Sequence, residues 1–146
     1  MSVEDVEEVL EIEASWSARP WSRRTFENEL GIPFSRSGVA IRANRPDHVL
    51  AYFVRWVVGD EVRLLSLAVR ESARREGLGG WLLDEVLDEA KALGCLRALL
   101  EVAETNLAAR ALYGSRGFRE VARREDYYGP GKAALVLERS VGRAVS

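Results

Sequence analysis

The chain has 146 residues, 47% of them hydrophobic and 30% charged, and its formal net charge is −2 at pH 7. This length predicts one domain over residues 1–146, with a core at about 3–139 and a short C-terminal tail. The near-neutral charge excludes the basic field of a general nucleic-acid binder, and no apolar run reaches the roughly 18 residues of a membrane-spanning helix. We therefore expect neither nucleic-acid nor membrane partners.

The single cysteine and the single histidine do not suggest a catalytic or metal centre. Cys95 cannot form an internal disulfide, and its apolar neighbours are typical of a buried structural thiol. His48 lies in a turn-like segment without partners at metal-ligand spacing. We expect no metal site. Because the N-terminus begins with an acidic helix and not a secretory segment, we also expect a cytoplasmic protein.

The N-terminal part of the chain predicts two helices. The first, over residues 3–16, has an apolar stripe among glutamates that is formed by Val3, Val6, Val9, Leu10 and Ala14. A second, short helix follows, with Ser22 as its N-cap. Phe26 and Leu30 are spaced to face a core from this second helix.

The middle of the chain predicts an antiparallel meander. Strand-like runs at residues 39–42, 49–58 and 62–69 are separated by turn-forming segments at 44–47 and 59–60. Such short connections are typical of antiparallel neighbours.

The second half predicts a β-α-β unit. A strongly periodic helix over residues 78–93 is followed by a buried strand over 96–102, which returns parallel to strand 62–69. A helix over about 105–114 and two strands, 118–122 and 133–137, complete the chain. The predicted fold is therefore an α/β domain whose mixed sheet, an antiparallel meander plus the β-α-β unit, is flanked by helices.

A glycine-rich run, Arg74-Arg75-Glu76-Gly77-Leu78-Gly79-Gly80, joins strand 62–69 to the helix over 78–93. Glycines at a helix start expose backbone N–H groups that can bind phosphate. A Walker A loop would place Lys and Ser or Thr after the glycine, whereas Gly79 is followed by Gly80-Trp81. A dinucleotide fingerprint would need glycine or alanine at position 82, which is leucine. What remains is another kind of phosphate loop or a plain glycine-rich turn.

The pattern Arg74-x-x-Gly77-x-Gly79 resembles the pyrophosphate loop of the GNAT superfamily of acyl-CoA-dependent N-acyltransferases. Further segments resemble those of the RimI-type ribosomal-protein alanine N-acetyltransferases within it: Glu11 to Glu13, Pro20-Trp21-Ser22, Phe26, Leu100-Glu101-Val102, Asn106, Ala111-Leu112-Tyr113, Gly117-Phe118 and Arg124-Glu125-Asp126-Tyr127-Tyr128. The resemblance covers about residues 5–138. It implies a GNAT-like fold with splayed parallel strands, and acetyl transfer from acetyl-CoA to a primary amine.

The resemblance also implies roles for individual residues. Glu101 would be the base that takes a proton from the amine, directly or through water, and Tyr113 the acid that protonates the departing thiolate. Backbone groups of Leu67, Ala68 and Val69 would hold the thioester carbonyl and the pantetheine arm. The implied pyrophosphate ligands are Arg74, Arg75 and the N–H groups of Gly77, Leu78, Gly79 and Gly80.

Structural roles are the alternatives for three of these residues. Glu101 can simply pair with a neighbouring arginine, and Tyr113 can be a core aromatic residue. Asn106 can bind the cofactor arm, cap its helix, or do both.

Three departures from the subfamily pattern concern the acceptor. Ala103 replaces arginine, Arg70-Glu71 replaces an acidic-proline pair, and Gly131-Lys132-Ala133 replaces an acidic pair that would attract a cationic peptide N-terminus. The Trp21-Ser22 and Tyr127-Tyr128 segments are the expected walls of the acceptor site.

The expected acceptor is the N-terminal amino group of a protein, such as a ribosomal protein, which attacks directly in a ternary complex. A small-molecule amine and a non-catalytic acyl-CoA-binding domain are the two alternatives. We expect a monomer or a weak dimer.

Overall fold

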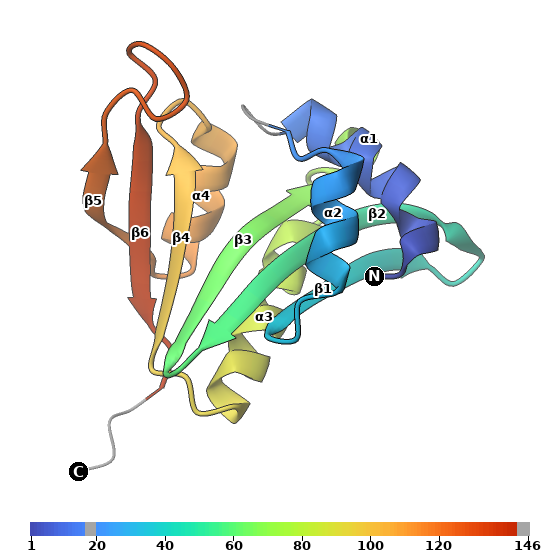
Figure 1. The fold of residues 1–146 in the computed structure, drawn as a ribbon, viewed down its shortest axis with the longest axis horizontal. Helices are drawn as coiled ribbons and strands as arrows, with labels where there is room; N and C mark the ends of the chain where they lie inside the picture. The colour runs from blue at the N-terminus through green and yellow to red at the C-terminus, as the bar shows by residue number, and fades with distance from the viewer. Residues whose placement is uncertain (17–19, 143–146) are drawn as a thin grey trace.

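A computed structural model describes residues 1–16 and 20–142 of the chain; the last four residues of the predicted tail lie outside them. The elements are η1 (Val3–Asp5), α1 (Val6–Trp16), α2 (Arg23–Leu30), β1 (Ser35–Arg42), β2 (Arg45–Val58), β3 (Glu61–Val69), η2 (Glu71–Ala73), α3 (Leu78–Ala92), β4 (Arg97–Ala103), α4 (Leu107–Ser115), β5 (Arg119–Arg124) and β6 (Ala134–Ser140). The strands form one sheet in the order β1-β2-β3-β4-β6-β5 (Figure 1). Only β3 and β4 pair in parallel. The predicted α/β fold with its mixed sheet is confirmed.

Helices α1 and α2 cover one face of the meander. Val6, Val9 and Ile12 of α1 pack with Phe26 of α2 against buried side chains of β2 and β3. Ser22 caps α2 as predicted, because its hydroxyl group accepts a hydrogen bond from the backbone N–H of Thr25.

The predicted apolar stripe of α1 is partly wrong. Val3 is 64% exposed and Ala14 is also exposed, whereas Ile12 and Glu13 are buried. The α-helix proper begins only at Val6, after the 3₁₀ turn η1. Because a 3₁₀ turn has about three residues and not 3.6, the face that follows it is rotated relative to the predicted one.

The first hairpin is longer than its sequence predicts. Strand β2 begins at Arg45 and pairs there with Arg42, inside the segment predicted as a turn. His48 accordingly lies in β2 and not in a turn. Proline is tolerated at the start of a strand, so Pro46 does not prevent the extension.

The two parallel strands separate after four residue pairs. Residues 61–64 of β3 pair with residues 97–100 of β4, and no pairing continues beyond Leu64 and Leu100. Leu65 is bulged relative to β2 at this point, because Val54 pairs with Ser66 while Arg55 pairs with Leu64. A bulge bends a strand locally, and Figure 1 shows β3 and β4 diverging upward from their paired ends. The predicted splay is confirmed.

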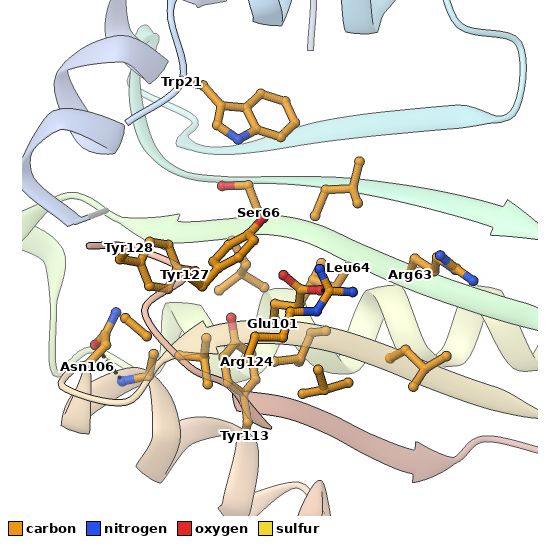
Figure 2. A pocket seen from close by; sticks show the side chains of 18 of the residues that line it. Trp21, Arg63, Leu64, Ser66, Glu101, Asn106, Tyr113, Arg124, Tyr127 and Tyr128 are labelled. Atoms are coloured by element: carbon orange, nitrogen blue, oxygen red, sulfur yellow. Dashed lines mark hydrogen bonds and ion pairs between the residues drawn. The ribbon is translucent and has the colours of Figure 1, made fainter. Parts of the chain in front are cut away.

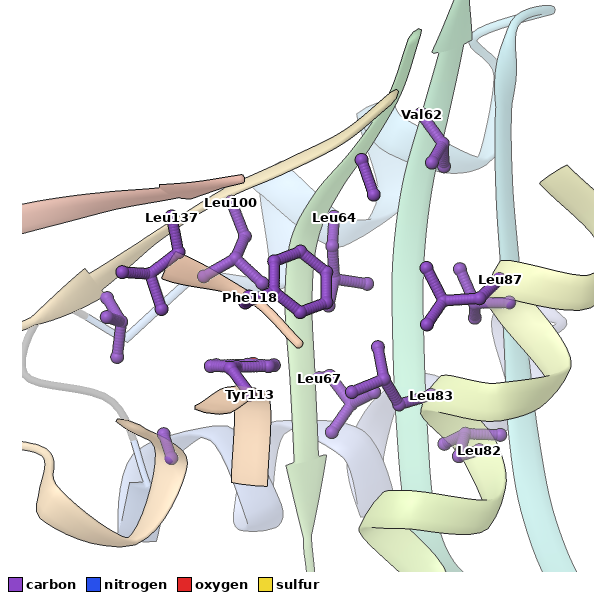
Figure 3. Close-up of a cluster of buried hydrophobic side chains, with 14 of the residues drawn as sticks. Val62, Leu64, Leu67, Leu82, Leu83, Leu87, Leu100, Tyr113, Phe118 and Leu137 are labelled. Carbon is purple, nitrogen blue, oxygen red and sulfur yellow. The ribbon is translucent and has the colours of Figure 1, made fainter. Parts of the chain in front are cut away.

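The main core lies between the other face of the sheet and helices α3 and α4 (Figure 3). It includes Leu64, Leu67, Leu82, Leu83, Leu87, Leu100, Tyr113, Phe118 and Leu137. Burying one such side chain stabilises the fold by about 1.5–3 kcal/mol. Strands β3 and β4 are not paired beyond Leu64 and Leu100, so this shared hydrophobic cluster holds the two parts of the sheet together there.

Candidate functional site

The space between the diverging strands is a cleft of about 540 Å³ (Figure 2). Along β4, Leu100 and Val102 belong to the core beneath α4, so the alternation of a strand directs Glu101 to the opposite face, that of α1 and α2. Tyr113 enters the same cleft from α4. The cleft therefore reaches both faces of the sheet.

Glu101 lines the cleft, but its side chain is not buried. Its side chain is 32% exposed, and Oε1 lies 3.2 Å from Arg124 Nη2 on the neighbouring hairpin. The arginine pairing that the sequence left as an alternative is thus present. Because Arg124 is 57% exposed, solvent screens this ion pair, which is worth at most about 1 kcal/mol. A cationic ligand can therefore displace Arg124 from the carboxylate.

Tyr113 is both a core residue and a cleft residue. It is 5% exposed, and its ring packs against Phe118 with centroids 5.8 Å apart. Burial raises the pKa of its phenol well above the ordinary value, so the group stays protonated. No described residue forms a hydrogen bond with its hydroxyl group, which points into the cleft (Figure 2). The phenol is placed to donate a proton to whatever occupies the cleft.

The glycine run forms a left-handed turn at the start of α3. Gly77 is the N-cap residue with φ +80° and ψ 8°, and Arg75 also has a positive φ of 70°. The N–H groups of residues 77–80 donate to no acceptor in the described part of the chain. Nothing lies within 4 Å of the position that a side chain at Gly77 would occupy. These free donors at a helix N-terminus fit an anionic group such as a pyrophosphate.

The next two glycines face the body of the protein. A side chain at Gly79 would meet Leu112 Cδ2 of α4 at 3.2 Å, and one at Gly80 would meet the guanidinium group of Arg116. Arg116 also contacts Asp84 of α3, with Nε 3.3 Å from Oδ1. The glycines thus allow α4 to pack closely against the first turn of α3.

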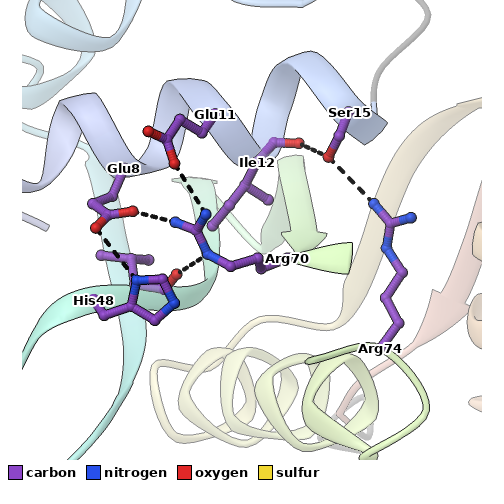
Figure 4. A network of polar contacts seen from close by, with 8 residues as sticks. Glu8, Glu11, Ile12, Ser15, His48, Arg70 and Arg74 are labelled. Carbon is purple, nitrogen blue, oxygen red and sulfur yellow. Dashed lines mark hydrogen bonds and ion pairs between the residues drawn. The ribbon is translucent and has the colours of Figure 1, made fainter. Parts of the chain in front are cut away.

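The two predicted arginine ligands differ in their surroundings. Arg74 Nε donates to the carbonyl oxygen of Val69 at 3.1 Å, and its Nη2 lies 3.4 Å from Ser15 Oγ of α1. Its guanidinium group therefore links α1 to the end of β3 (Figure 4). Arg75 is exposed.

Of the residues expected to hold a cofactor arm, Leu67 and Asn106 line the cleft, whereas Ala68 and Val69 do not. Residues 67–69 of β3 pair with β2 but have no partner on β4. Asn106 Oδ1 accepts a hydrogen bond from Ala109 N at 3.1 Å, so Asn106 caps α4. The amide nitrogen of Asn106 makes no hydrogen bond to a described residue, and the side chain lines the cleft. Capping and ligand binding are thus compatible at this position.

Aromatic side chains also border the cleft. Trp21 packs on Phe26, with ring centroids 5.0 Å apart. Tyr127 and Tyr128 form an edge-to-face pair, and Arg124 lies over the ring of Tyr127. Trp21, Tyr127 and Tyr128 all line the cleft, whereas Ser22 lies at the start of α2 and outside the lining.

The sequence analysis assigned no role to one cluster of polar side chains in the cleft. Glu13 of α1 and Ser66 of β3 line it, and both contact the buried hydroxyl group of Tyr52. Glu13 follows Val9 by four residues and so continues a buried helix face. This spacing could have indicated that Glu13 is buried. Glu13 is, however, one of six acidic residues within residues 4–13, so it does not stand out in the sequence.

The departures from the subfamily pattern have structural contexts. Arg70 donates to Val49 O at 2.8 Å and forms ion pairs with Glu8 and Glu11, which ties α1 to the end of β3 (Figure 4). Ala103 lines the cleft. Lys132 closes the turn that presents the tyrosine pair, since Tyr128 N donates to its carbonyl oxygen at 3.0 Å.

Residues 1–16 and 20–142 contain no cluster of three or more His, Cys, Asp or Glu side chains that could hold a metal ion. Cys95 is buried in the main core and does not line the cleft. Within the same residues, no helix combines the length and the apolar character needed to cross a membrane.

The chain is similar to a family of known proteins along most of its length. The sequence profile of the Acetyltransferase (GNAT) family matches residues 6–118. The [Ribosomal protein bS18]-alanine N-acetyltransferase of Salmonella typhimurium is 35% identical over 128 residues, which cover 88% of this chain and 84% of that protein.

Solved structures agree with the sequence similarity. The crystal structure of the ribosomal-protein-S18-alanine N-acetyltransferase from Escherichia coli superposes with a TM-score of 0.89 at 30% identity, covering 100% of this chain and 94% of that one. Ard1 from Thermoplasma volcanium gives a TM-score of 0.87 at 26% identity, covering 97% and 94% of the two chains.

Proposed function

The chain belongs to the acetyltransferase (GNAT) family, and we propose that its acceptor is the α-amino group of an alanine at a protein N-terminus. Family membership makes the protein an acetyl-CoA-dependent N-acetyltransferase. The finer proposal is supported by the similarity to the Salmonella and Escherichia coli enzymes, whose names give ribosomal protein bS18 as their substrate. We infer the same acceptor class here, and with it a cytoplasmic enzyme.

The observation that carries the proposal is the cleft that joins the two faces of the sheet. It brings the carboxyl group of Glu101 and the hydroxyl group of Tyr113 to one space from opposite faces of the sheet. An acceptor can enter from the α1 and α2 face while a long, flexible donor lies on the face of α3 and α4. Such an arrangement suits direct transfer in a ternary complex.

On the donor side, acetyl-CoA supplies an acetyl thioester and a pyrophosphate. The free N–H groups of residues 77–80 would hold the pyrophosphate, and Arg75 would add positive charge at the same loop. Arg74 is bonded to Val69 and Ser15, so its contribution would include fixing the loop. The unpaired edge of residues 67–69 would hold the carbonyl and the arm, together with Asn106.

At the reacting centre, two side chains would move protons. Glu101 would accept a proton from the acceptor ammonium, directly or through water, after the amine displaces Arg124. Tyr113, which burial keeps protonated, would donate its proton to the departing sulfur. Both assignments are consistent with the positions of the groups in the cleft.

A panel of acceptors tests the acceptor class. We expect a peptide with the N-terminal residues of ribosomal protein bS18 from the same organism to be acetylated at its α-amino group, as measured by mass spectrometry. The Glu101→Gln variant should lower kcat for this peptide about a hundredfold, since general base catalysis contributes at least that much. Turnover of small amines without turnover of any N-terminal peptide would contradict the proposal.

A further inference from the structure

The cleft contains a buried carboxylate that the proposed reaction does not use. Glu13 is 2% exposed, yet it lines the cleft. Its contacts with the described residues are hydrogen bonds from Tyr52, Ser66 and the backbone of Trp21, and no cation among those residues pairs with it. A buried carboxylate without a counter-ion is costly, so its position at the wall of a binding site points to a role there.

The hydrogen bonds around Glu13 have a defined direction. The Tyr52 hydroxyl group donates to Glu13 Oε1. Burial, with the adjacent Glu13 charge, raises the pKa of Tyr52 well above its ordinary value, so the phenol keeps its single proton. Ser66 Oγ lies 2.7 Å from the same phenol oxygen and 3.4 Å from Glu13 Oε1. Since the hydrogen of Tyr52 is already used, Ser66 must be the donor in its contacts.

This direction leaves Ser66 as a hydrogen-bond acceptor toward the cleft. A serine hydroxyl group has one hydrogen and two lone pairs, and the hydrogen of Ser66 is directed at Tyr52 and Glu13. No described residue donates to Ser66 Oγ, and the side chain lines the cleft. The lone pairs of Ser66 Oγ therefore face the cleft, and the negative charge of Glu13 lies next to Ser66. An N–H donor, preferably a cationic one, is the matching ligand.

The location of Ser66 fits the amino group of the acceptor. Ser66 directly follows the bulged Leu65, where β3 leaves β4 and the cleft opens. Its side chain reaches Tyr52 and Glu13, which lie on the α1 and α2 face. That is also the face to which β4 directs Glu101. Figure 2 shows Trp21 and Ser66 on one wall and Glu101, Arg124 and Tyr113 on the other.

We propose that Ser66 accepts a hydrogen bond from the α-ammonium group of the acceptor, and that Glu13 is the positioning residue that directs Ser66 and favours a cation. This inference rests on the proposed function, because it takes a protein N-terminus as the occupant. Glu13 also supplies a negative charge at the cleft, whereas the Gly131-Lys132-Ala133 segment carries no acidic side chain.

A matched pair of ligands tests the proposal. The first is an alanine-starting peptide substrate, and the second is the same peptide with the α-amino group replaced by hydrogen, which can only inhibit. For Ser66→Ala we expect the KM of the substrate to rise about tenfold, the loss typical of a hydrogen bond to a charged group. The inhibition constant of the desamino peptide and the KM for acetyl-CoA should stay unchanged, and kcat should change less than KM.

Variants of the carboxylates separate charge from shape. Glu13→Gln keeps the size of the side chain but removes its charge, and it should raise the same KM selectively. Glu29→Gln is the control, because Glu29 is also buried and accepts a hydrogen bond from Trp56 Nε1 at 2.6 Å, but it does not line the cleft. It should leave both peptide constants unchanged. Tyr52→Phe leaves the charge of Glu13 and its contact with Ser66 in place, so it should raise this KM less than Glu13→Gln does.

Two results would overturn the inference. In one, Ser66→Ala leaves the KM of the substrate unchanged; in the other, it weakens both peptides equally, which would make Ser66 a part of the wall only. Failure of the proposed function looks different, since the wild-type enzyme would then acetylate no N-terminal peptide. The variants would in that case be measured with the small amine that the enzyme accepts, and an unchanged KM would again refute the role of Ser66.

Discussion

The two groups proposed to move protons experience different surroundings within one cleft. Glu101 is 32% exposed and shares its carboxylate with Arg124, so water and a cationic ligand both reach it. Tyr113 is buried, which favours the neutral phenol over the phenolate. An exposed carboxylate is suited to accept a proton from an incoming amine. A buried phenol stays protonated through the neutral pH range and is therefore available as a proton donor.

The hydroxyl group of Tyr113 can be removed with little change in packing. Tyr113→Phe keeps the ring that contacts Phe118 and removes only the proton donor. We expect kcat to fall about a hundredfold while the KM of the peptide and the melting temperature stay close to those of the wild type. Steady-state kinetics with calorimetry checks this. An unchanged kcat would make Tyr113 a core residue only.

At the scale of elements, the start of helix α3 is the segment most directly shaped by its glycines. Gly77 adopts φ +80° with open space around its Cα, so its conformation and not crowding requires glycine. Gly94 adopts φ +87° just beyond the other end of the same helix, also in open space. The two glycines are conformationally alike, but only Gly77 belongs to the candidate phosphate loop.

Valine substitutions at these two glycines separate folding from binding. Gly77→Val and Gly94→Val should each destabilise the fold by about 1–2 kcal/mol, the cost of a left-handed conformation for a residue with a side chain. Only Gly77→Val should also raise the KM for acetyl-CoA, because it displaces the N–H donors of the loop. Urea unfolding and initial rates measure the two effects. Equal KM values for the two variants would argue against pyrophosphate binding at residues 77–80.

The elements themselves were largely predictable from periodicity and turn residues. The helix over 78–93 and the parallel return of strand 96–102 follow from an apolar repeat followed by a glycine and a short buried run. The start of β2 was not predictable, because Asn44 to Asp47 has the composition of a turn while its register is set by pairing with β1. Local composition carries no information about such a partner.

The cleft was predictable only in part. Glu101, Asn106 and Tyr113 carry a family signature, and the structure brings all three to one cleft. Glu13 and Ser66 lie in an acidic helix and an apolar strand, where nothing in the local sequence marks them as partners. They come together only in the folded structure, where both contact Tyr52 of β2 and Ser66 Oγ lies 3.4 Å from Glu13 Oε1. The ion pair between Glu101 and Arg124 is likewise a product of the final hairpin.

At the scale of the whole molecule, each of the two cores contains a buried tyrosine. Tyr52 lies in the cluster beneath α1 and α2, and Tyr113 lies in the cluster beneath α3 and α4. Burial raises the pKa of each phenol above its ordinary value. In the unfolded chain both phenols would ionise near pH 10, whereas in the folded protein they stay neutral at that pH.

This difference makes stability fall at alkaline pH. Because the pKa of each phenol is raised in the folded state, its contribution to the free energy of unfolding is fully present below the unfolded pKa of about 10. That contribution is lost as the pH rises above this value. We expect the melting temperature to decrease between pH 9 and 11. The decrease should be smaller for Tyr113→Phe, which removes one of the two groups. A wild-type curve that stays flat over this interval would contradict the assignment.

A cleft that passes through a sheet, and does not merely indent one side, has consequences for kinetic order. In the proposed arrangement the donor and the acceptor enter from opposite faces of the sheet, so neither must leave before the other enters. Initial-velocity plots should therefore intersect and not run parallel. Free CoA should inhibit competitively against acetyl-CoA but not against the peptide. The acetylated peptide should compete only with the peptide substrate. Parallel plots would indicate a covalent acetyl-enzyme instead, and the only cysteine of the chain, Cys95, is buried away from this passage.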